Sequence, residues 1–430
     1  MIKKLALLFI SGYFLSCSTT EKEENTSTSE RQGSQSNYVP SGFHASINHG
    51  KKNQPVSLLL EDSLYHLYYT TGTDELGHLK SVNLLDWDYD QSISIGDSYG
   101  KVQYDLFNSS GLSEPWIKYW VDDNELIIST SADGKSNWND RSVLKTEGFN
   151  PSISWDSNLE QWILVLTNGN KLEIHTSVDF LRWESSSEIV YETPLQSASL
   201  SQIGSQWLFV LNQEEIKYQI GSFDGASFIP LGTPSSLFEG SNFQSANLFH
   251  TGDKTLLIAQ SEKNTNSTSP TFSLPLEVDI KDENILLFPT SHFRSKFTGK
   301  RRGKLSKLVA EGPSWYSFTI DQKFSNLKMI LNDPASSMNM EWDTERKIIK
   351  FDRSKSSIGD LEIIESNLSI DPDNLKVDIL IDHDVIDIFF NDGEAYFSIS
   401  VKPFSFFSEV QIYLDDKKYD ARGVLFNIGI

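Results

Sequence analysis

The sequence is nearly free of cysteine, since Cys17 is the single one among 430 residues. No disulfide can therefore form within the chain, and beyond position 17 there is no thiolate ligand for a metal. Long apolar runs are also missing, because the run from Leu5 to Leu15 is too short to span a bilayer. Stretches of helical periodicity are almost absent from residue 38 onward, which argues against helical folds. Stability must come from packing of strands.

Positive charge is scarce as well. Lys and Arg number 37 against 59 Asp and Glu, for a formal net charge of -22. Such a charge repels nucleic acid phosphates and anionic lipid heads, but leaves neutral ligands such as sugars open. The motifs H-E-x-x-H, G-x-S-x-G and G-x-x-x-x-G-K-[ST] do not occur, so we expect no metal and no nucleotide cofactor.

The N-terminus has the features of an export signal. Lys3 and Lys4 precede the apolar run, and the run stops just before Cys17. This segment resembles the lipobox of bacterial lipoproteins, which implies cleavage after residue 16 and lipidation of Cys17. An ordinary secretory signal cut nearby is the alternative. Residues 18–37 are too polar to bury a core and are expected to form a flexible tether.

The start of the tether is acidic, with Glu21, Glu23 and Glu24. These residues resemble the surface-export signals of some Gram-negative lipoproteins. We therefore expect a bacterial outer membrane lipoprotein at the cell surface, held to the membrane by its lipid anchor.

One pattern recurs through the first two thirds of the chain: a strand, then Ser-x-Asx, then an aromatic residue four or five positions later. The four copies are Ser81, Asn83, Trp87; Ser131, Asp133, Trp138; Ser177, Asp179, Trp183; and Ser222, Asp224, Phe228. Their period of about 45 to 50 residues is typical of propeller blades. Each Asx is expected to cap a tight turn between outer strands, and each aromatic to fill the gap between blades. Four copies suggest five blades.

The repeat ends after Pro289, where a second domain is expected to begin. Residues 294–304 are predicted to form a basic connector, and alternating strands follow, as in 375–390. The segment Asn391, Asp392, Gly393 predicts a hairpin turn. The sequence thus indicates an all-β chain with a five-bladed β-propeller at 38–293 and a β-sandwich at 294–430.

Several segments resemble one family of sugar hydrolases. They are Phe43 to Ser46, Leu64 to Tyr69, Gly77 and His78 with Trp87, Gly221 to Gly225, Ser273 to Pro275, and Ile381 to Phe397. Together they are similar to glycoside hydrolase family 32, the invertase, inulinase and levanase family. The resemblance implies a propeller whose central funnel holds the sugar site, packed on a sandwich.

The resemblance does not extend to the carboxylates of the family. It places Gln54, next to Asn53, at the position of the nucleophile, Asn150 at the stabilising Asp, and Gln196 at the general acid. Retaining cleavage requires two carboxyl groups about 5 to 5.5 Å apart, and amides replace neither. We therefore expect the protein to be catalytically silent.

Two explanations of the amides stay open. They could still hold a fructosyl unit through hydrogen bonds, or the site has drifted after selection for cleavage was relaxed. Lys51 and Lys52, where the family has an apolar pair, favour drift or a changed ligand. Trp116 and Trp120, which flank Tyr119, are further candidates for stacking on sugar, with core packing as their alternative.

The preferred hypothesis is a surface lipoprotein that binds fructan or a related oligo- or polysaccharide in the propeller funnel without cleaving it. The first rival is an active hydrolase or fructosyl-transferring enzyme that uses other carboxylates, with Asp105, Glu114, Glu192 and Glu239 as candidates. The second rival is a scaffold that binds a protein of a sugar-uptake system.

Overall fold

The computed structural model describes residues 38–41, 43–47, 54–71, 75–94, 100–105, 108–238, 240, 243–252, 254–261, 272–356, 363–401 and 407–428. Strands dominate these residues, and no helix among them is long and apolar enough to cross a membrane. Cys17 and the expected signal and tether lie outside the described ranges. The predicted all-β fold is confirmed.

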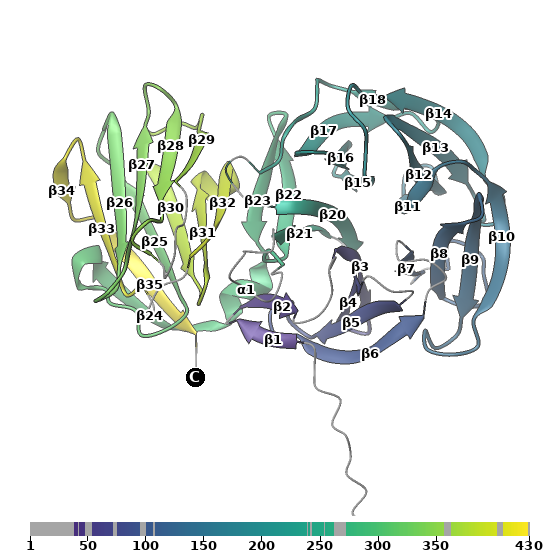
Figure 1. Cartoon of the computed structure of the whole chain (residues 1–430), viewed down its shortest axis with the longest axis horizontal. Coiled ribbons are helices and arrows are strands. Elements are labelled where there is room, and N and C mark those ends of the chain that lie inside the picture. The colour runs from purple at the N-terminus through teal and green to yellow at the C-terminus, as the bar shows by residue number, and fades with distance from the viewer. Residues whose placement is uncertain are drawn as a thin grey trace, which may run out of the picture. The chain divides into compact units, whose positions relative to one another are not determined.

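Five antiparallel sheets form the propeller, and their innermost strands surround a common centre (Figure 1). The first three blades are β3 (Pro55–Glu61), β4 (Leu64–Thr70), β5 (Glu75–Ser81) and β6 (Asp88–Ser94); β7 (Lys101–Tyr104), β8 (Trp116–Asp122), β9 (Glu125–Ser131) and β10 (Asn139–Lys145); β11 (Phe149–Asp156), β12 (Gln161–Asn168), β13 (Lys171–Ser177) and β14 (Glu184–Val190). The last two are β15 (Ser197–Ile203), β16 (Gln206–Asn212), β17 (Ile216–Phe223), β18 (Phe228–Pro230) and β19 (Ser235–Ser236); β20 (Phe243–Thr251), β21 (Lys254–Ser261), β22 (Leu276–Lys281) and β23 (Asn284–Pro289).

The recurring Asx residues cap the turn that leads into the fourth strand of a blade, as predicted. Oδ1 of Asp179 accepts the backbone N–H groups of Leu181 (3.1 Å) and Arg182 (2.9 Å). Asn83, Asp133 and Asp224 each accept two backbone N–H groups in the same way. The short side chain supplies the acceptor that the turn backbone lacks.

The fifth blade lacks this motif because it turns by another device. Asp282 and Glu283, between β22 and β23, both have left-handed backbone angles, with φ of 50° and 62°. Two successive positive φ values are the signature of a two-residue hairpin turn that follows the twist of the strands. Such a turn needs no Asx cap, so the Ser-x-Asx motif cannot be recognised in the sequence of the fifth blade.

The sandwich consists of two six-stranded sheets. One contains β24 (Phe297–Lys304), β35 (Arg422–Ile428), β25 (Ser314–Ile320), β30 (Leu375–Ile381), β31 (Val385–Phe390) and β32 (Ala395–Ser400) in this order. The other contains β29 (Ile364–Asn367), β28 (Ile348–Asp352), β27 (Ser337–Asp343), β26 (Asn326–Asn332), β33 (Glu409–Leu414) and β34 (Lys417–Tyr419). The remaining elements are α1 (Ser291–Ser295), the 3-10 turns η1 (Leu305–Lys307) and η2 (Asn391–Gly393), and the pair β1 (Tyr38–Ser41) and β2 (His44–Ile47).

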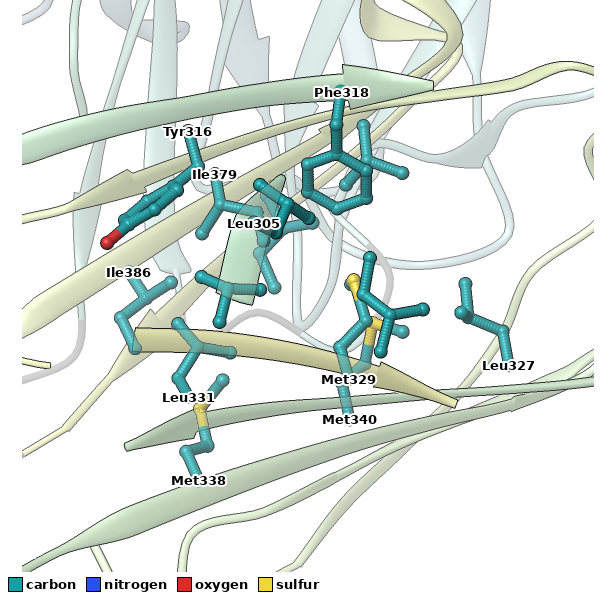
Figure 2. Packing of buried hydrophobic residues seen from close by; sticks show 14 of the residues in the cluster. Leu305, Tyr316, Phe318, Leu327, Met329, Leu331, Met338, Met340, Ile379 and Ile386 are labelled. Carbon is teal, nitrogen blue, oxygen red and sulfur yellow. The ribbon is translucent and has the colours of Figure 1, made fainter. Parts of the chain in front are cut away.

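The core of the sandwich lies between the two sheets. Met329 and Leu331 of β26 and Met340 of β27 are fully buried, opposite side chains of the other sheet such as Tyr316 and Ile379 (Figure 2). Burial of this apolar surface is the main stabilising contribution in a domain without disulfides. The predicted hairpin at 391–393 is present as η2 between β31 and β32.

The basic segment 294–304 differs from its prediction. Instead of a connector, residues 297–304 form β24, which pairs with β35 at the edge of a sandwich sheet. Edge strands commonly carry Lys because its charge discourages pairing with other chains, and this explains the basic composition. Helix α1 lies between β23 and β24, and the expected domain boundary at 293 and 294 falls inside it.

A buried ion cluster joins β2 to the sandwich. Nδ1 of His44 lies 2.8 Å from Asp382, and Nε2 lies 2.9 Å from Asp387. Tyr396 donates to the same Asp387 (2.7 Å). Burial disfavours the charged imidazolium, but the two carboxylates outweigh it and raise the pKa of His44 to about 10.

Candidate functional site

The five innermost strands of the propeller, β3, β7, β11, β15 and β20, define its channel (Figure 1). Each blade begins at its innermost strand, so these strands run in the same direction around the channel. Residues that precede or open them therefore gather at one end, which we call the rim. Gln54, Asn150 and Gln196 all occupy such positions, on three different blades.

Gln54 is held just before β3 by its own backbone. Its carbonyl oxygen accepts the N–H of Thr70 (2.9 Å), and its N–H donates to Oγ1 of the same Thr70 (2.9 Å). These two bonds fix the main chain and leave the partly exposed carboxamide of Gln54 unconstrained by them.

Asn150 sits in an irregularity at the start of β11. Its φ of 52° lies in the left-handed region, and the pairing of β11 with β12 shifts register between Phe149 and Ser152. Asn tolerates this conformation better than most residues, and a bulge redirects a side chain. Here Nδ2 of Asn150 donates to the backbone carbonyl oxygen of Gln196. The structure thus brings two of the three predicted positions into direct contact.

Two buried asparagines extend this contact around the rim. The N–H of Gln196 donates to the carbonyl oxygen of Asn212 (2.8 Å), and the carboxamide of Asn212 exchanges two hydrogen bonds with the backbone of Ala246 (2.8 and 2.9 Å). The adjacent Asn247 donates to the carbonyl oxygen of Pro55 (2.8 Å). We call the set Asn150, Gln196, Asn212 and Asn247 the amide arc.

Sequence reasoning missed Asn212 and Asn247, which are 1% and 5% exposed. Asn212 ends β16 and Asn247 lies in the middle of β20, and buried amides in such positions signal a hydrogen-bond network. Oδ1 of Asn247 has no hydrogen-bond partner among the described residues.

A cavity of about 510 Å³ occupies the channel beyond the rim. Its walls come from all five innermost strands, for example Ser57 of β3, Lys101 of β7, Trp155 of β11, Ser201 of β15 and Thr251 of β20. Gln54, Asn150 and Gln196 do not line this cavity, which begins two or more residues further along the strands. Among the described residues that do, Asp105 is the only carboxylic acid.

Asp105 is engaged in the structure of its own loop. Its oxygens accept the N–H groups of Ser109 (2.8 Å) and Ser110 (2.8 Å) and the hydroxyl of Ser110 (2.6 Å). A carboxylate that accepts three hydrogen bonds from its own loop caps that loop, which gives Asp105 a structural role.

Lys101 is the most unusual side chain of the cavity. It is 7% exposed, and no described residue accepts a hydrogen bond from its ammonium or pairs with it. Burial lowers its pKa to about 8, because the charged form is poorly solvated there. Sequence reasoning missed it, although a lysine opening a short strand of a propeller blade was a visible signal.

Of the other proposed acids, neither Glu114 nor Glu192 lines the cavity with Asp105. Glu114 precedes β8 and lies at the same end of the channel as Asp105, whose N–H donates to the carbonyl oxygen of Pro115 (2.8 Å). Glu114 itself accepts a hydrogen bond from Thr130 (2.5 Å). Glu192 is exposed in the loop before β15, and Glu239 lies outside the described residues.

The aromatic candidates are placed differently from the exposed loop that sugar stacking requires. Trp116 and Trp120 belong to β8 and are 3% and 4% exposed, and Tyr119 between them is 3% exposed. Both tryptophans pack in one apolar cluster with Val56. The core alternative therefore holds for them, and the indoles that line the cavity belong to half-buried Trp155 and buried Trp162.

Asn53, Lys51 and Lys52 lie outside the described residues, so the roles predicted for them are not tested by the structure. The described residues contain no group of three or more His, Cys, Asp or Glu that could hold a metal ion.

Comparison with known proteins identifies the C-terminal part most directly. Residues 250–420 match the model of the glycosyl hydrolases family 32 C-terminal domain. An extracellular exo-inulinase of Meyerozyma guilliermondii is 25% identical over 259 residues, which cover 48% of this chain and 50% of that protein. The match thus spans about half the length of this curated relative.

Solved structures show the same fold over nearly the whole chain. The exo-inulinase from Aspergillus awamori superposes with a TM-score of 0.72 at 16% identity, covering 90% of this chain and 98% of that one. The fructofuranosidase from Schwanniomyces occidentalis complexed with fructose gives 0.73 at 18% identity, covering 92% and 99%. Their propeller-and-sandwich architecture is the one described above.

Proposed function

Because the chain belongs to glycoside hydrolase family 32, we propose that it is a member that binds fructan or a related glycan at the propeller channel without cleaving it. The solved relative in complex with fructose supports carbohydrate as the ligand class. The proposal separates recognition, for which the scaffold is preserved, from catalysis, for which the acids are missing.

The observation that carries the proposal is the hydrogen bond from Nδ2 of Asn150 to the carbonyl oxygen of Gln196. An ionised Asp cannot donate there and would set a carboxylate oxygen against a carbonyl oxygen. The amide is therefore matched to its neighbours. The family position is occupied by a side chain whose neutral form the surrounding structure uses.

Retaining hydrolysis also needs a glycosyl ester on one carboxylate and a proton from another. Gln54 and Gln196 offer neutral carboxamides, which form no such ester and release no proton near neutral pH. Removing preorganised charge from an active site costs several orders of magnitude in rate. We therefore expect turnover far below that of a hydrolase.

The test is to offer levan, inulin and sucrose to the purified full-length chain. We expect no release of fructose, together with retarded migration in native gels that contain levan or inulin. Release of fructose at rates comparable with an active family member would contradict catalytic silence. Unretarded migration with every polysaccharide would contradict glycan binding.

A matched pair of variants locates the binding. Gln196→Ala removes an exposed carboxamide at the rim, whereas Gln202→Ala changes the same residue type near the other end of β15. We expect retardation to weaken for Gln196→Ala and to persist for Gln202→Ala. Equal retardation of both variants would show that the rim does not take part in binding.

We further propose that a lipid on Cys17 anchors the chain in the bacterial outer membrane, facing the cell surface. Support comes from the basic and apolar residues before Cys17 and the acidic tether after it. Cys17→Ser should abolish incorporation of labelled palmitate and move the protein out of the membrane fraction. Protease added to intact cells should degrade the anchored protein if it faces outward.

A further inference from the structure

The channel cavity contains a cation that no described residue neutralises. Lys101 is the only lysine or arginine among the described residues that line it, and its side chain is 7% exposed. A buried charge is normally paired or hydrogen-bonded, because leaving water without compensation is unfavourable. Lys118 of the neighbouring strand β8 follows that rule, since its ammonium donates to the carbonyl oxygen of Ser94 (2.9 Å) and lies over the ring of Trp138.

The nearest acid of the cavity is too distant to serve as a partner. Asp105 lies four residues beyond Lys101 along the extended chain, or about 13 Å at the rise of a strand. Its oxygens are already bonded to Ser109 and Ser110. Among the described residues, therefore, none competes with a ligand in the cavity for the positive charge of Lys101.

The remaining lining suits a polyhydroxylated molecule. Oγ of Ser154 is buried without a hydrogen-bond partner among the described residues, and Gln103 adds a carboxamide. Trp155 contributes a half-buried indole, the type of surface on which the C–H face of a sugar packs. A volume of about 510 Å³ lies within the range of small-molecule sites.

We propose that this cavity binds a small polyhydroxylated ligand bearing a carboxylate or phosphate group, and that this group pairs with Lys101. The inference deepens the proposed glycan binding by adding a charge to the ligand, and it rests on that function only in taking the channel as the binding site. It also explains how an anion can bind to a chain of net charge -22, since the cation is buried close to the ligand.

The test uses pairs of sugars that differ in one acidic group. Calorimetric titration of the full-length chain with D-glucuronate against D-glucose, and with fructose 6-phosphate against fructose, separates a carboxylate from a phosphate. We expect at least one acidic sugar to bind tenfold or more tightly than its neutral partner. Lys101→Met and Lys101→Gln should abolish this difference, whereas Lys118→Met, a matched loss of a buried lysine outside the cavity, should preserve it.

The pH dependence gives a second readout. The other titratable groups that line the cavity are Asp105, Tyr104, Tyr119 and His250. Affinity for the acidic sugar should fall as pH rises through the region in which Lys101 loses its proton, and the Lys101 variants should show no such fall.

Equal affinity for acidic and neutral sugars, or an undiminished preference in either folded Lys101 variant, would overturn the inference. So would absence of binding by both acidic sugars. Circular dichroism identifies the variants that fold. Retardation by neutral levan, measured in Lys101→Met, tests the proposed function separately, because it does not depend on the charge.

Discussion

At the scale of single residues, the difference between an amide and an acid is one proton-bearing nitrogen, and position 150 shows what that nitrogen does. Asn150 uses it to hold the carbonyl of Gln196, on the next blade, while its backbone occupies the left-handed region. Asp shares the preference of Asn for that region, so the hydrogen bond distinguishes the two residues more than the backbone does.

The variant Asn150→Asp therefore tests whether the hydrogen bond donated by the Asn150 amide stabilises the protein. We expect it to lower the free energy of unfolding by about 1 to 3 kcal/mol at pH 7, because a donor is lost and an oxygen faces an oxygen. Denaturant unfolding measures the change. The loss should shrink as pH falls below the pKa of the introduced carboxyl, since a protonated Asp can donate again. A stability equal to that of the unchanged chain at pH 7 would refute the role of the amide.

Lys101 provides the opposite case, because it lowers the stability of the protein when no ligand is bound. Its folded-state pKa of about 8 lies below the unfolded value of 10.5, so below pH 8 the folded state carries the cost of a buried charge. We expect Lys101→Met to raise the free energy of unfolding at pH 7 by about 3 kcal/mol. The gain should disappear between pH 8 and 10.5, as the unchanged chain loses its charge. Lys118→Met should show a smaller gain, because burial also lowers the pKa of Lys118 but its partners offset part of the cost.

At the scale of elements, the turns are the most predictable part of the chain. The Asx oxygen, two backbone N–H groups and a following aromatic lie close in sequence, so four blades could be recognised without knowing their neighbours. The amide arc could not be predicted in this way. Asn212 and Asn247 act between blades, and their partners are backbone groups far away in the sequence.

The turn caps make a simple prediction. Asp179→Asn keeps the accepting oxygen that Asn83 supplies in the first blade, so we expect the stability of this variant to change little. Asp179→Ala removes the acceptor and should lower the free energy of unfolding by about 1 kcal/mol. Thermal unfolding of the two variants side by side checks the prediction. Equal losses would mean that the ion pair with Arg182 matters more than the cap.

At the scale of the whole molecule, the alternation of residues 377–382 predicted a strand but not its second buried face. Val377, Ile379 and Ile381 point into the sandwich core, whereas Leu380 packs in a cluster with propeller residues such as Leu276. Asp378 and Asp382 share that second face and are 1% exposed. The burial of this face could not be predicted, because the sequence of one strand carries no information about what will cover it.

The His44 cluster makes the stability of the assembly depend on pH. The folded pKa of about 10 exceeds the usual 6.5, so its contribution is fully present below pH 6.5 and is lost as pH rises through about 10. His44→Gln removes the charge and should lower the free energy of unfolding by about 3 to 5 kcal/mol at pH 6. The difference between variant and unchanged chain should narrow toward pH 10. A constant difference across this range would show that His44 is not charged in the folded protein.

The order of strands in the first sandwich sheet bears on how the protein is made. Strand β35, from residues 422–428, lies between β24 and β25 and pairs with both. The gap between these two earlier strands closes only after residue 428 has left the ribosome. During vectorial synthesis the blades can assemble one after another, while the sandwich must wait. Stalling or export in mid-chain would thus leave an open pair of β edges, a substrate for chaperones.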